Sequence, residues 1–199
     1  MSLFNSWDAA IFQLINVQGQ NAFFDILMPF ITNLRNFYSV LAVLAIWLVW
    51  RDRKAGIIFL LFIAATLTLT DQFSSHLLKP WVGRIRPCRF LENVRLLTDC
   101  NTSYSFPSSH AVNIFAAAFF LSQPFKKLRV LWYGIAAAVG YSRIYIGIHY
   151  PFDVIGGGGI GLLMAWPMRR FKDAAVSYFC KKSNYRGAKS PGSAARKPE

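Results

Sequence analysis

Long apolar runs separated by short polar clusters make up most of this chain. Five such runs stand out, at residues 36–50, 55–78, 111–125, 130–141 and 152–168. A helix of about 20 apolar residues crosses the hydrocarbon core of a bilayer, so the second run can span on its own, and the first can if its helix begins a turn earlier. The pattern predicts an all-α fold, a polytopic transmembrane helical bundle of about five or six spans.

The residues before these runs have a different pattern. Residues 6–17 place apolar side chains at helical spacing with polar ones between them, which predicts an amphipathic helix lying in the membrane interface. Residues 23–31 form a short apolar stretch containing an aspartate and a proline, typical of a half-helix or a re-entrant segment. We therefore expect an N-terminal interfacial segment, residues 1–35, and a membrane core, residues 36–178. The first residues show no basic leader or cleavage site, so we expect insertion through the internal apolar segments.

Composition and charge support the membrane class. The chain is 54% hydrophobic and 16% charged, too apolar for an ordinary soluble domain, and its formal net charge is +13. The basic residues fall in short clusters between apolar runs and not over one surface, so we expect no nucleic-acid partner. Clusters at residues 51–54, 126–129 and 169–172 fall on one side when the spans alternate. The positive-inside rule makes that side cytoplasmic, which places residues 79–107 and 144–151 together on the outward face.

The last residues of the chain, 179–199, are basic and rich in Gly, Ser and Pro. This composition is typical of a disordered segment. The segment follows the basic cluster that ends the fifth run, so we expect a cytoplasmic tail close to anionic lipid headgroups.

Basic residues also crowd the outward end of the second run, where the positive-inside rule disfavours them. They are Lys79, Arg84, Arg86, Arg89 and Arg95. Lysine or arginine at a helix end can extend to the headgroups, which is the ordinary interpretation of any one of them. So many cations on the outer side favour an anionic ligand instead.

A second cluster, residues 105–110, directly precedes the third apolar run and reads Ser-Phe-Pro-Ser-Ser-His. A proline near the first helical position fixes the start of a helix, and the free backbone N–H groups of its first turn can bind phosphate. A serine-capped helix with an interfacial histidine is the alternative.

A third cluster, residues 142–153, joins the fourth run to the fifth. Pro151 suits a helix start, which places Asp153 in the first turn, within reach of His149 just outside it. A carboxylate on one ring nitrogen orients an imidazole and makes the other nitrogen a better nucleophile. Alternatively, Asp153 is a first-turn acid that complements the helix dipole.

Together the three clusters supply what metal-free phosphoryl transfer needs: a nucleophile, a proton donor, and cations for the phosphate oxygens. They read K-x6-R-P at residues 79–87, P-S-S-H at residues 107–110 and S-R-x5-H-x3-D at residues 142–153. With these motifs the chain resembles the type 2 phosphatidic acid phosphatase superfamily over residues 36–170. The second motif of that family usually reads P-S-G-H, so Ser109 adds a side chain to the expected phosphate cradle.

The resemblance implies a role for each matched residue. His149 would attack phosphorus and form a phosphohistidine, Asp153 would orient it, and His110 would protonate the leaving lipid oxygen and later activate water. The groups implied to hold the phosphate oxygens are the side chains of Lys79, Arg86, Ser108 and Arg143 and the backbone N–H groups of Ser109 and His110. No metal ion and no cofactor is implied.

Two cysteines, Cys88 and Cys100, lie in the outward loop, an oxidising location. We predict a disulfide between them, which would make the segment carrying Arg86 and Arg89 more rigid. Two reduced thiols are the alternative.

The sequence therefore predicts an integral membrane phosphatase that hydrolyses a lipid phosphate or diphosphate at the outer face of a bacterial cytoplasmic membrane. The substrates implied by the resemblance are undecaprenyl diphosphate, phosphatidylglycerol phosphate, phosphatidic acid and lipid A phosphate. We favour the first two because the chain is short and has no added domain for a bulky headgroup. Two alternatives stay open: a lipid phosphotransferase that uses the same residues, and a protein that binds or transports a lipid phosphate without cleaving it. The expected partners are this lipid and the surrounding membrane, and no oligomeric state is predicted.

Overall fold

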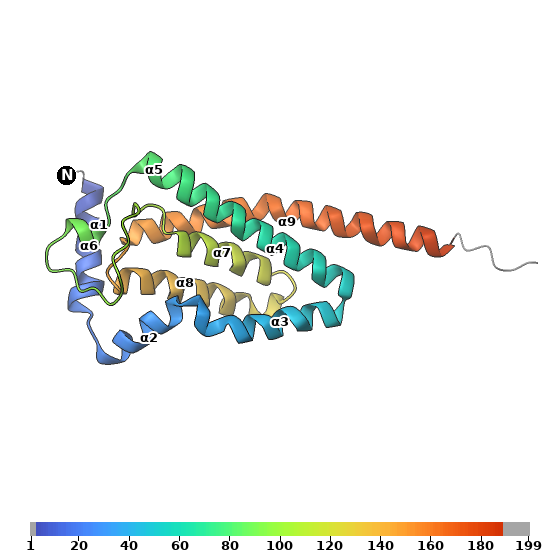
Figure 1. Cartoon of the computed structure of the whole chain (residues 1–199), viewed down its shortest axis with the longest axis horizontal. Helices are drawn as coiled ribbons and strands as arrows, with labels where there is room; N and C mark the ends of the chain where they lie inside the picture. The colour runs from blue at the N-terminus through green and yellow to red at the C-terminus, as the bar shows by residue number, and fades with distance from the viewer. Residues whose placement is uncertain (1–2, 189–199) are drawn as a thin grey trace, which may run out of the picture.

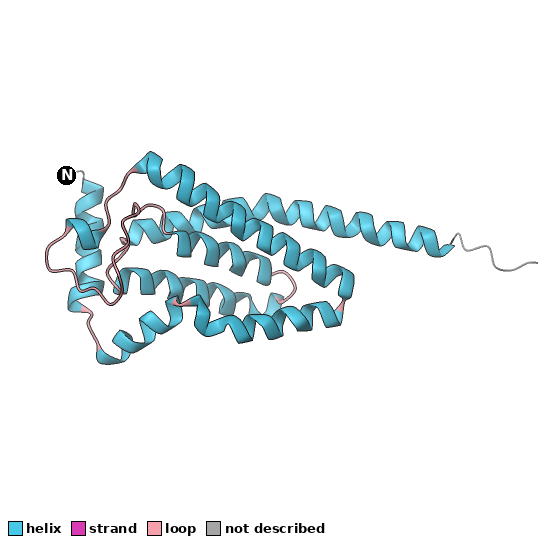
Figure 2. Ribbon diagram, in the orientation of Figure 1, coloured by secondary structure: helices cyan, strands magenta, loops and turns pink. Residues whose placement is uncertain are grey.

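The computed structural model describes residues 3–188, and every regular element in this part of the chain is a helix (Figure 2). In chain order the elements are α1 Leu3–Gln13, η1 Leu14–Gln18, α2 Ala22–Thr32, η2 Leu34–Phe37, α3 Tyr38–Arg51, α4 Arg53–Gln72, η3 Phe73–Leu78, α5 Lys79–Val82, α6 Pro87–Phe90, α7 Ser109–Leu121, η4 Lys126–Leu128, α8 Arg129–Tyr145 and α9 Pro151–Ala188. The η1 and η3 segments are π-helical, whereas η2 and η4 are 3-10 turns. The prediction of an all-α fold is confirmed.

The long helices α3, α4, α7, α8 and α9 run in alternating directions along one bundle (Figure 1). The α3–α4 and α7–α8 connections lie at one end of it, which we name the opposite end. Residues 83–108 and residues 146–150 lie at the other end, together with α1, and we name this the site end. All three predicted clusters are therefore at the site end, and the basic turns after α3 and α7 are at the opposite end.

Two helical stretches are long and apolar enough to cross a membrane by length and composition, Leu34–Arg51 and Arg53–Phe90. Within the latter, α4, η3 and α5 form one continuous helix, residues 53–82, that reaches the site end. The apolar helices α2 and α7 are shorter. Nevertheless α7 is central to the bundle, because it packs against α4, α8 and α9 and buries Ala111, Val112 and Phe120 completely.

The α3–α4 hairpin is tight because its turn residues suit it. Asp52 caps α4, since its Oδ1 accepts a hydrogen bond from the Ala55 N–H at 3.0 Å. A Cβ added to Gly56 would lie 2.5 Å from the carbonyl oxygen of Leu48, so only glycine permits this approach of the two helices. The basic residues Arg51, Arg53 and Lys54 flank Asp52, the single residue between the two helices.

The last helix, α9, begins at Pro151 with a proline in its first turn and packs closely against α7. A Cβ added to Gly157 would lie 2.8 Å from the carbonyl oxygen of Ser108, so the small residue allows the start of α7 to approach α9. The helix continues through Ala188, beyond residue 179, where the disordered tail was expected to begin. The rest of that tail, residues 189–199, lies outside the described residues.

The N-terminal helix α1 lies across the site end and contacts α9 (Figure 1). It is amphipathic, as predicted, with Trp7 64% exposed and Phe12 fully buried. The buried face of α1 and of η1, which follows it, also carries two polar side chains, Asp8 on α1 and Asn16 on η1, both without solvent exposure. The Asn16 amide donates to the carbonyl oxygens of Arg95 and Tyr145 at 2.8 and 2.7 Å, which ties the first helical segment to the loop and to α8. This segment is thus part of the protein core at the site end, an arrangement that an interfacial helix alone does not require.

Candidate active site

Backbone hydrogen bonds bring the three predicted clusters together at the site end. The Ser105 N–H donates to the carbonyl oxygen of Arg84 at 2.7 Å, which joins the second cluster to the first. The Ser108 N–H donates to the carbonyl oxygen of Asp153 at 3.0 Å, which joins the second cluster to the third. Residues from α5, α7 and α9 that are far apart in sequence therefore share one site.

The imidazole of His149 is almost fully enclosed, with 2% of the side chain exposed, in the connection between α8 and α9. Its Nε2 lies 3.1 Å from Nη1 of Arg86. Because a guanidinium only donates hydrogen bonds, Nε2 accepts, carries no proton and presents a lone pair. The proton of the neutral ring is then on Nδ1, which faces Oδ2 of Asp153 at 3.5 Å. Burial lowers the pKa of His149 to about 4, which keeps the ring neutral at pH 7.

The carboxylate of Asp153 is held in place from three sides. Oδ2 accepts hydrogen bonds from the Ser105 hydroxyl and, at 2.8 Å, from the Tyr150 N–H, while Oδ1 accepts from Nη1 of Arg84 at 2.7 Å. The Nδ1 atom of His149 is buried and makes no hydrogen bond of its own in the described structure. A small rotation of the ring would bring the Nδ1–H of His149 within hydrogen-bond distance of Oδ2 of Asp153.

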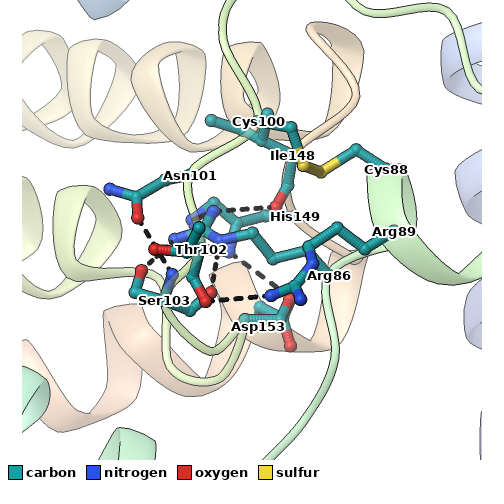
Figure 3. The surroundings of a disulfide bond; sticks show 11 residues. Arg86, Cys88, Arg89, Cys100, Asn101, Thr102, Ser103, Ile148, His149 and Asp153 are labelled. Carbon is teal, nitrogen blue, oxygen red and sulfur yellow. Dashed lines mark hydrogen bonds and ion pairs between the residues drawn. A yellow bond between two sulfur atoms is a disulfide. The ribbon is translucent and has the colours of Figure 1, made fainter.

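Arg86 is fixed in the same way (Figure 3). Its Nε donates to the Ser103 carbonyl oxygen at 2.8 Å, its Nη2 donates to the Ser103 hydroxyl at 2.9 Å, and its Nη1 donates to the Ile148 carbonyl oxygen at 3.0 Å. Only 4% of the residue is exposed. Burial lowers the pKa of Arg86, which still leaves it cationic beside His149.

The other predicted cations lie around the same point. Arg143 donates from Nη1 to the Thr32 hydroxyl at 2.8 Å, whereas its Nε is buried and has no partner in the described structure. The Ser108 hydroxyl is also buried without a partner there. Buried polar atoms in native proteins are normally hydrogen-bonded, so these two atoms are positioned to receive a polar ligand. Lys79 is buried, with 8% of its surface exposed.

His110, by contrast, is exposed in the first turn of α7. It is within electrostatic reach of Lys79, Arg86, Arg143 and His149. An accessible imidazole among cations can exchange protons with a ligand and with water, which a buried one cannot.

Ser109, the departure from the usual motif, does not fill the cradle. Its hydroxyl lies 3.0 Å from that of Ser74 on η3, so the side chain faces the neighbouring helix.

A disulfide joins Cys88 to Cys100, with Cα atoms 6.3 Å apart (Figure 3). It closes the loop of residues 88–100, and Arg86 and Ser103 lie just outside the two ends of that loop. Arg89 extends the same arrangement by donating to the Thr102 carbonyl oxygen at 3.0 Å. No group of three or more His, Cys, Asp or Glu side chains suited to a metal ion occurs among the described residues. Independence from metal stays a prediction.

Two residues of the site, Arg84 and Asp8, were not assigned a role by the sequence analysis. Arg84 was noted only as one of several cations, and it bonds Asp153 and, through Nη2, Asp8 at 2.6 Å. Asp8 was grouped with the polar positions of an interfacial helix. A usable signal was present: Asp8, Phe12 and Asn16 are four residues apart, so an acid and an amide share one face with an apolar residue, and all three are fully buried.

Comparison with known proteins identifies the family. Residues 55–177 match the family model of the PAP2 superfamily. The chain is 33% identical over 158 residues to an undecaprenyl-diphosphatase of Sulfolobus acidocaldarius, covering 78% of this chain and 73% of that protein. It is 35% identical over 127 residues to a lipid A 4'-phosphatase of Bacteroides thetaiotaomicron, covering 57% of this chain. That alignment spans about half, 53%, of the relative's length.

A solved structure agrees with these relatives. The crystal structure of a transmembrane PAP2 type phosphatidylglycerolphosphate phosphatase from Bacillus subtilis superposes with a TM-score of 0.67 at 26% identity, covering 87% of this chain and 88% of that one. The chain belongs to the PAP2 superfamily. It is a PAP2-family membrane lipid phosphatase, so the predicted family and hydrolase class are confirmed.

Proposed function

We propose that this protein hydrolyses a lipid phosphate or diphosphate through a phosphohistidine formed on Nε2 of His149. The observation that carries the proposal is the state of that ring. Nε2 accepts a hydrogen bond from Arg86, so its lone pair points at a cation that would hold a phosphate oxygen, and Nδ1 faces Asp153. A neutral imidazole with a carboxylate behind it is an activated nucleophile.

In the first step the substrate phosphate enters among the cations. Arg86 exchanges its contact with Nε2 for a phosphate oxygen, and the freed lone pair attacks phosphorus as the bond to the lipid oxygen breaks. His110 supplies the proton that the leaving oxygen needs. The positive charge that develops on His149 is stabilised by Asp153 through the Nδ1 proton.

In the second step the phosphohistidine is hydrolysed. His110, now unprotonated, takes a proton from water as the water oxygen attacks phosphorus and the bond to Nε2 breaks. Inorganic phosphate leaves and His149 returns to its neutral form. The expected cradle for the phosphate oxygens consists of the side chains of Lys79, Arg86, Ser108 and Arg143 and the backbone N–H groups of Ser109 and His110.

The preferred substrate class is undecaprenyl diphosphate or phosphatidylglycerol phosphate, with phosphatidic acid and lipid A phosphate as further candidates. Relatives named as an undecaprenyl-diphosphatase, a phosphatidylglycerophosphatase B and a lipid A 4'-phosphatase support this range. The helices α3, α4, α7, α8 and α9 are proposed to span a bacterial cytoplasmic membrane. Basic residues in the α3–α4 and α7–α8 connections support a cytoplasmic opposite end and an outward site end.

The test is phosphate release by purified protein in detergent with EDTA, from a panel of these four lipids. We expect release by the wild type and a loss of about four orders of magnitude or more in His149→Gln. Quenching the wild-type reaction with SDS at alkaline pH should trap a phosphoenzyme that is stable in alkali and labile in acid. Phosphate transfer to an added alcohol in place of water would favour the phosphotransferase alternative. Lipid binding without any release would favour a binding or transport protein.

A further inference from the structure

A carboxylate from the N-terminal helix is buried at the site. Asp8 of α1 has no solvent exposure, and its Oδ2 lies 2.6 Å from Nη2 of Arg84. Nη1 of the same guanidinium lies 2.7 Å from Oδ1 of Asp153, whose other oxygen faces His149. Four side chains, Asp8, Arg84, Asp153 and His149, are thus joined in one line from α1 to the nucleophile.

Asp8 also holds the start of α9. Its Oδ1 accepts a hydrogen bond from the Phe152 N–H at 2.9 Å, next to Asp153 in the chain. Arg84 is fixed in a third direction, because its Cζ lies 4.0 Å from the centre of the Tyr150 ring. The guanidinium therefore has one defined place, and α1 and α9 determine it together.

The charges along this line explain what Asp8 adds. Arg84 and Asp153 alone would cancel, which would leave little negative potential beside His149. A second carboxylate on Arg84 leaves the trio with one net negative charge at the moment when the imidazole becomes cationic. Fixed charges aimed at a developing charge are most effective in a buried site such as this one.

We propose that Asp8 is a positioning residue that acts through Arg84 on Asp153. Helix α1 thus supplies a residue that catalysis requires. This inference depends on the proposed reaction at His149. Asp8 touches neither the substrate nor the reacting atoms. It sets the orientation and the effective charge of the carboxylate behind the nucleophile.

The substitution Asp8→Asn tests the charge with little change of shape. The amide oxygen can still accept from the Phe152 N–H, while the second negative charge is lost. We expect kcat and the rate of phosphoenzyme formation to fall about 10- to 100-fold, the range found for carboxylates that support the histidine ligands of metal sites. KM should stay within about twofold of the wild type, because the substrate contacts are intact.

The matched control is Asp25→Asn at the same end of the bundle. Asp25 pairs with Arg95 at 2.6 Å, as Asp8 pairs with Arg84, but no hydrogen bond links Arg95 to His149 or Asp153. We expect kcat within about twofold of the wild type, because a partly exposed ion pair contributes little. An equal fall of kcat in both variants would mean general loosening of the site end and would overturn the proposal.

Two further variants measure the link to Arg84. In an Arg84→Lys background, Asp8→Asn should have a much smaller effect on kcat than in the wild type, because residues that act through one another are not additive. Asp8→Glu keeps the charge and should recover part of the activity lost in Asp8→Asn. If Asp8→Asn fails to fold, as judged by size-exclusion chromatography, the smaller neutral variant Asp8→Ser becomes the deciding one. A lower kcat at constant KM then supports the proposal, and a wild-type kcat overturns it.

The outcomes separate the two proposals. An active wild type with a wild-type kcat in Asp8→Asn would overturn the role of Asp8 alone. A wild type that releases no phosphate from any of the lipids would overturn the proposed function, and the positioning role with it.

Discussion

The two ends of this helical bundle are held together in different ways. At the site end, buried polar and charged side chains meet across long stretches of sequence, as in the pairing of Arg84 with Asp8 and Asp153. At the opposite end, the core is an apolar cluster built on Phe59 and Phe120. The full set of buried residues in that cluster is Leu48, Phe59, Ala116, Phe120 and Ala165. Charged residues at this end lie at the edge of the core: Lys172 lies over the Phe59 ring, and the Arg169–Asp173 pair is 40% and 50% exposed.

The difference shows which end of the bundle tolerates substitution and which end requires particular residues. Apolar contacts between helices in a membrane gain from close packing but tolerate exchange of one apolar side chain for another of similar volume. A buried charge tolerates no loss of its partner, because the remaining group is left without compensation. The arrangement of the segments at the site end therefore depends on a few specific pairs of buried charged residues. At the opposite end it depends on how well the apolar side chains fill the space between the helices.

The largest contrast is expected between two arginine substitutions. Arg84→Met leaves Asp8 and Asp153 buried near each other without their shared cation, which should lower the free energy of unfolding by about 3–5 kcal/mol. Arg169→Met removes an exposed pair and should change it by at most about 0.5 kcal/mol. Denaturant titration in mixed micelles measures both. Equal losses in the two variants would contradict the comparison of the ends.

Arg86→Lys addresses catalysis at the site end. Lysine keeps one charge but cannot donate at once to Ser103, Ile148 and His149, so kcat should fall about 10²- to 10³-fold. Arg89→Lys, three residues along the same loop, is the control. Its contact with the Thr102 carbonyl oxygen is exposed, and kcat should stay within about twofold of the wild type. Phosphate release under saturating substrate measures the effect, and a wild-type kcat in Arg86→Lys would argue against a role for this residue in phosphate binding.

The sequence patterns were sufficient to predict the helices, because a helix is determined by the spacing of apolar residues that are close together in the chain. The apolar run at residues 55–78 became one continuous helix, α4 with η3, and the amphipathic residues 6–17 became α1 with η1. The three motif clusters meet because alternating helices must return to the same end. Glycine and aspartate at the α3–α4 turn are likewise explained by local geometry.

The contacts of Asp8 and Asn16 could not be predicted in the same way. Their partners are far away, 144 residues along the chain for the Phe152 N–H and 129 for the Tyr145 carbonyl oxygen. Polar residues on an amphipathic helix normally face water or headgroups, so the sequence pattern predicted exposed positions for Asp8 and Asn16. The π-helical segment η3 brings the Ser74 hydroxyl to the Ser109 hydroxyl of α7. It has no local sequence signal either, because it depends on packing against α7.

Loss of the disulfide at the site end should have a smaller effect on the free energy of unfolding than Arg84→Met. Replacing Cys88 and Cys100 together by serine opens a loop with a sequence separation of 12. The chain-entropy argument predicts a loss of about 2–3 kcal/mol in the free energy of unfolding. The comparable apolar substitution Phe120→Leu, at the opposite end, should leave kcat unchanged, whereas the double serine variant should lower it through the segment that carries Arg86. Alkylation followed by mass spectrometry checks the bond itself, and two free thiols in the wild type would contradict it.

A further contrast is expected in the acid response of stability, and again it should come from the site end. The pKa of His149, in the connection outside the helices, is lowered by burial to about 4, whereas an unfolded histidine titrates near 6.5. Between these values the unfolded chain binds the extra proton, so stability is complete above about pH 6.5 and declines as the pH falls toward 4. His149→Gln removes the titrating group, and its stability should therefore decline less steeply over this window. Phe120→Leu shifts stability by a constant amount at every pH, because no ionisation changes with it. Parallel wild-type and His149→Gln curves between pH 7 and pH 4.5 would mean that folding leaves the pKa of this ring unchanged, and would contradict its burial as a neutral imidazole below pH 6.5.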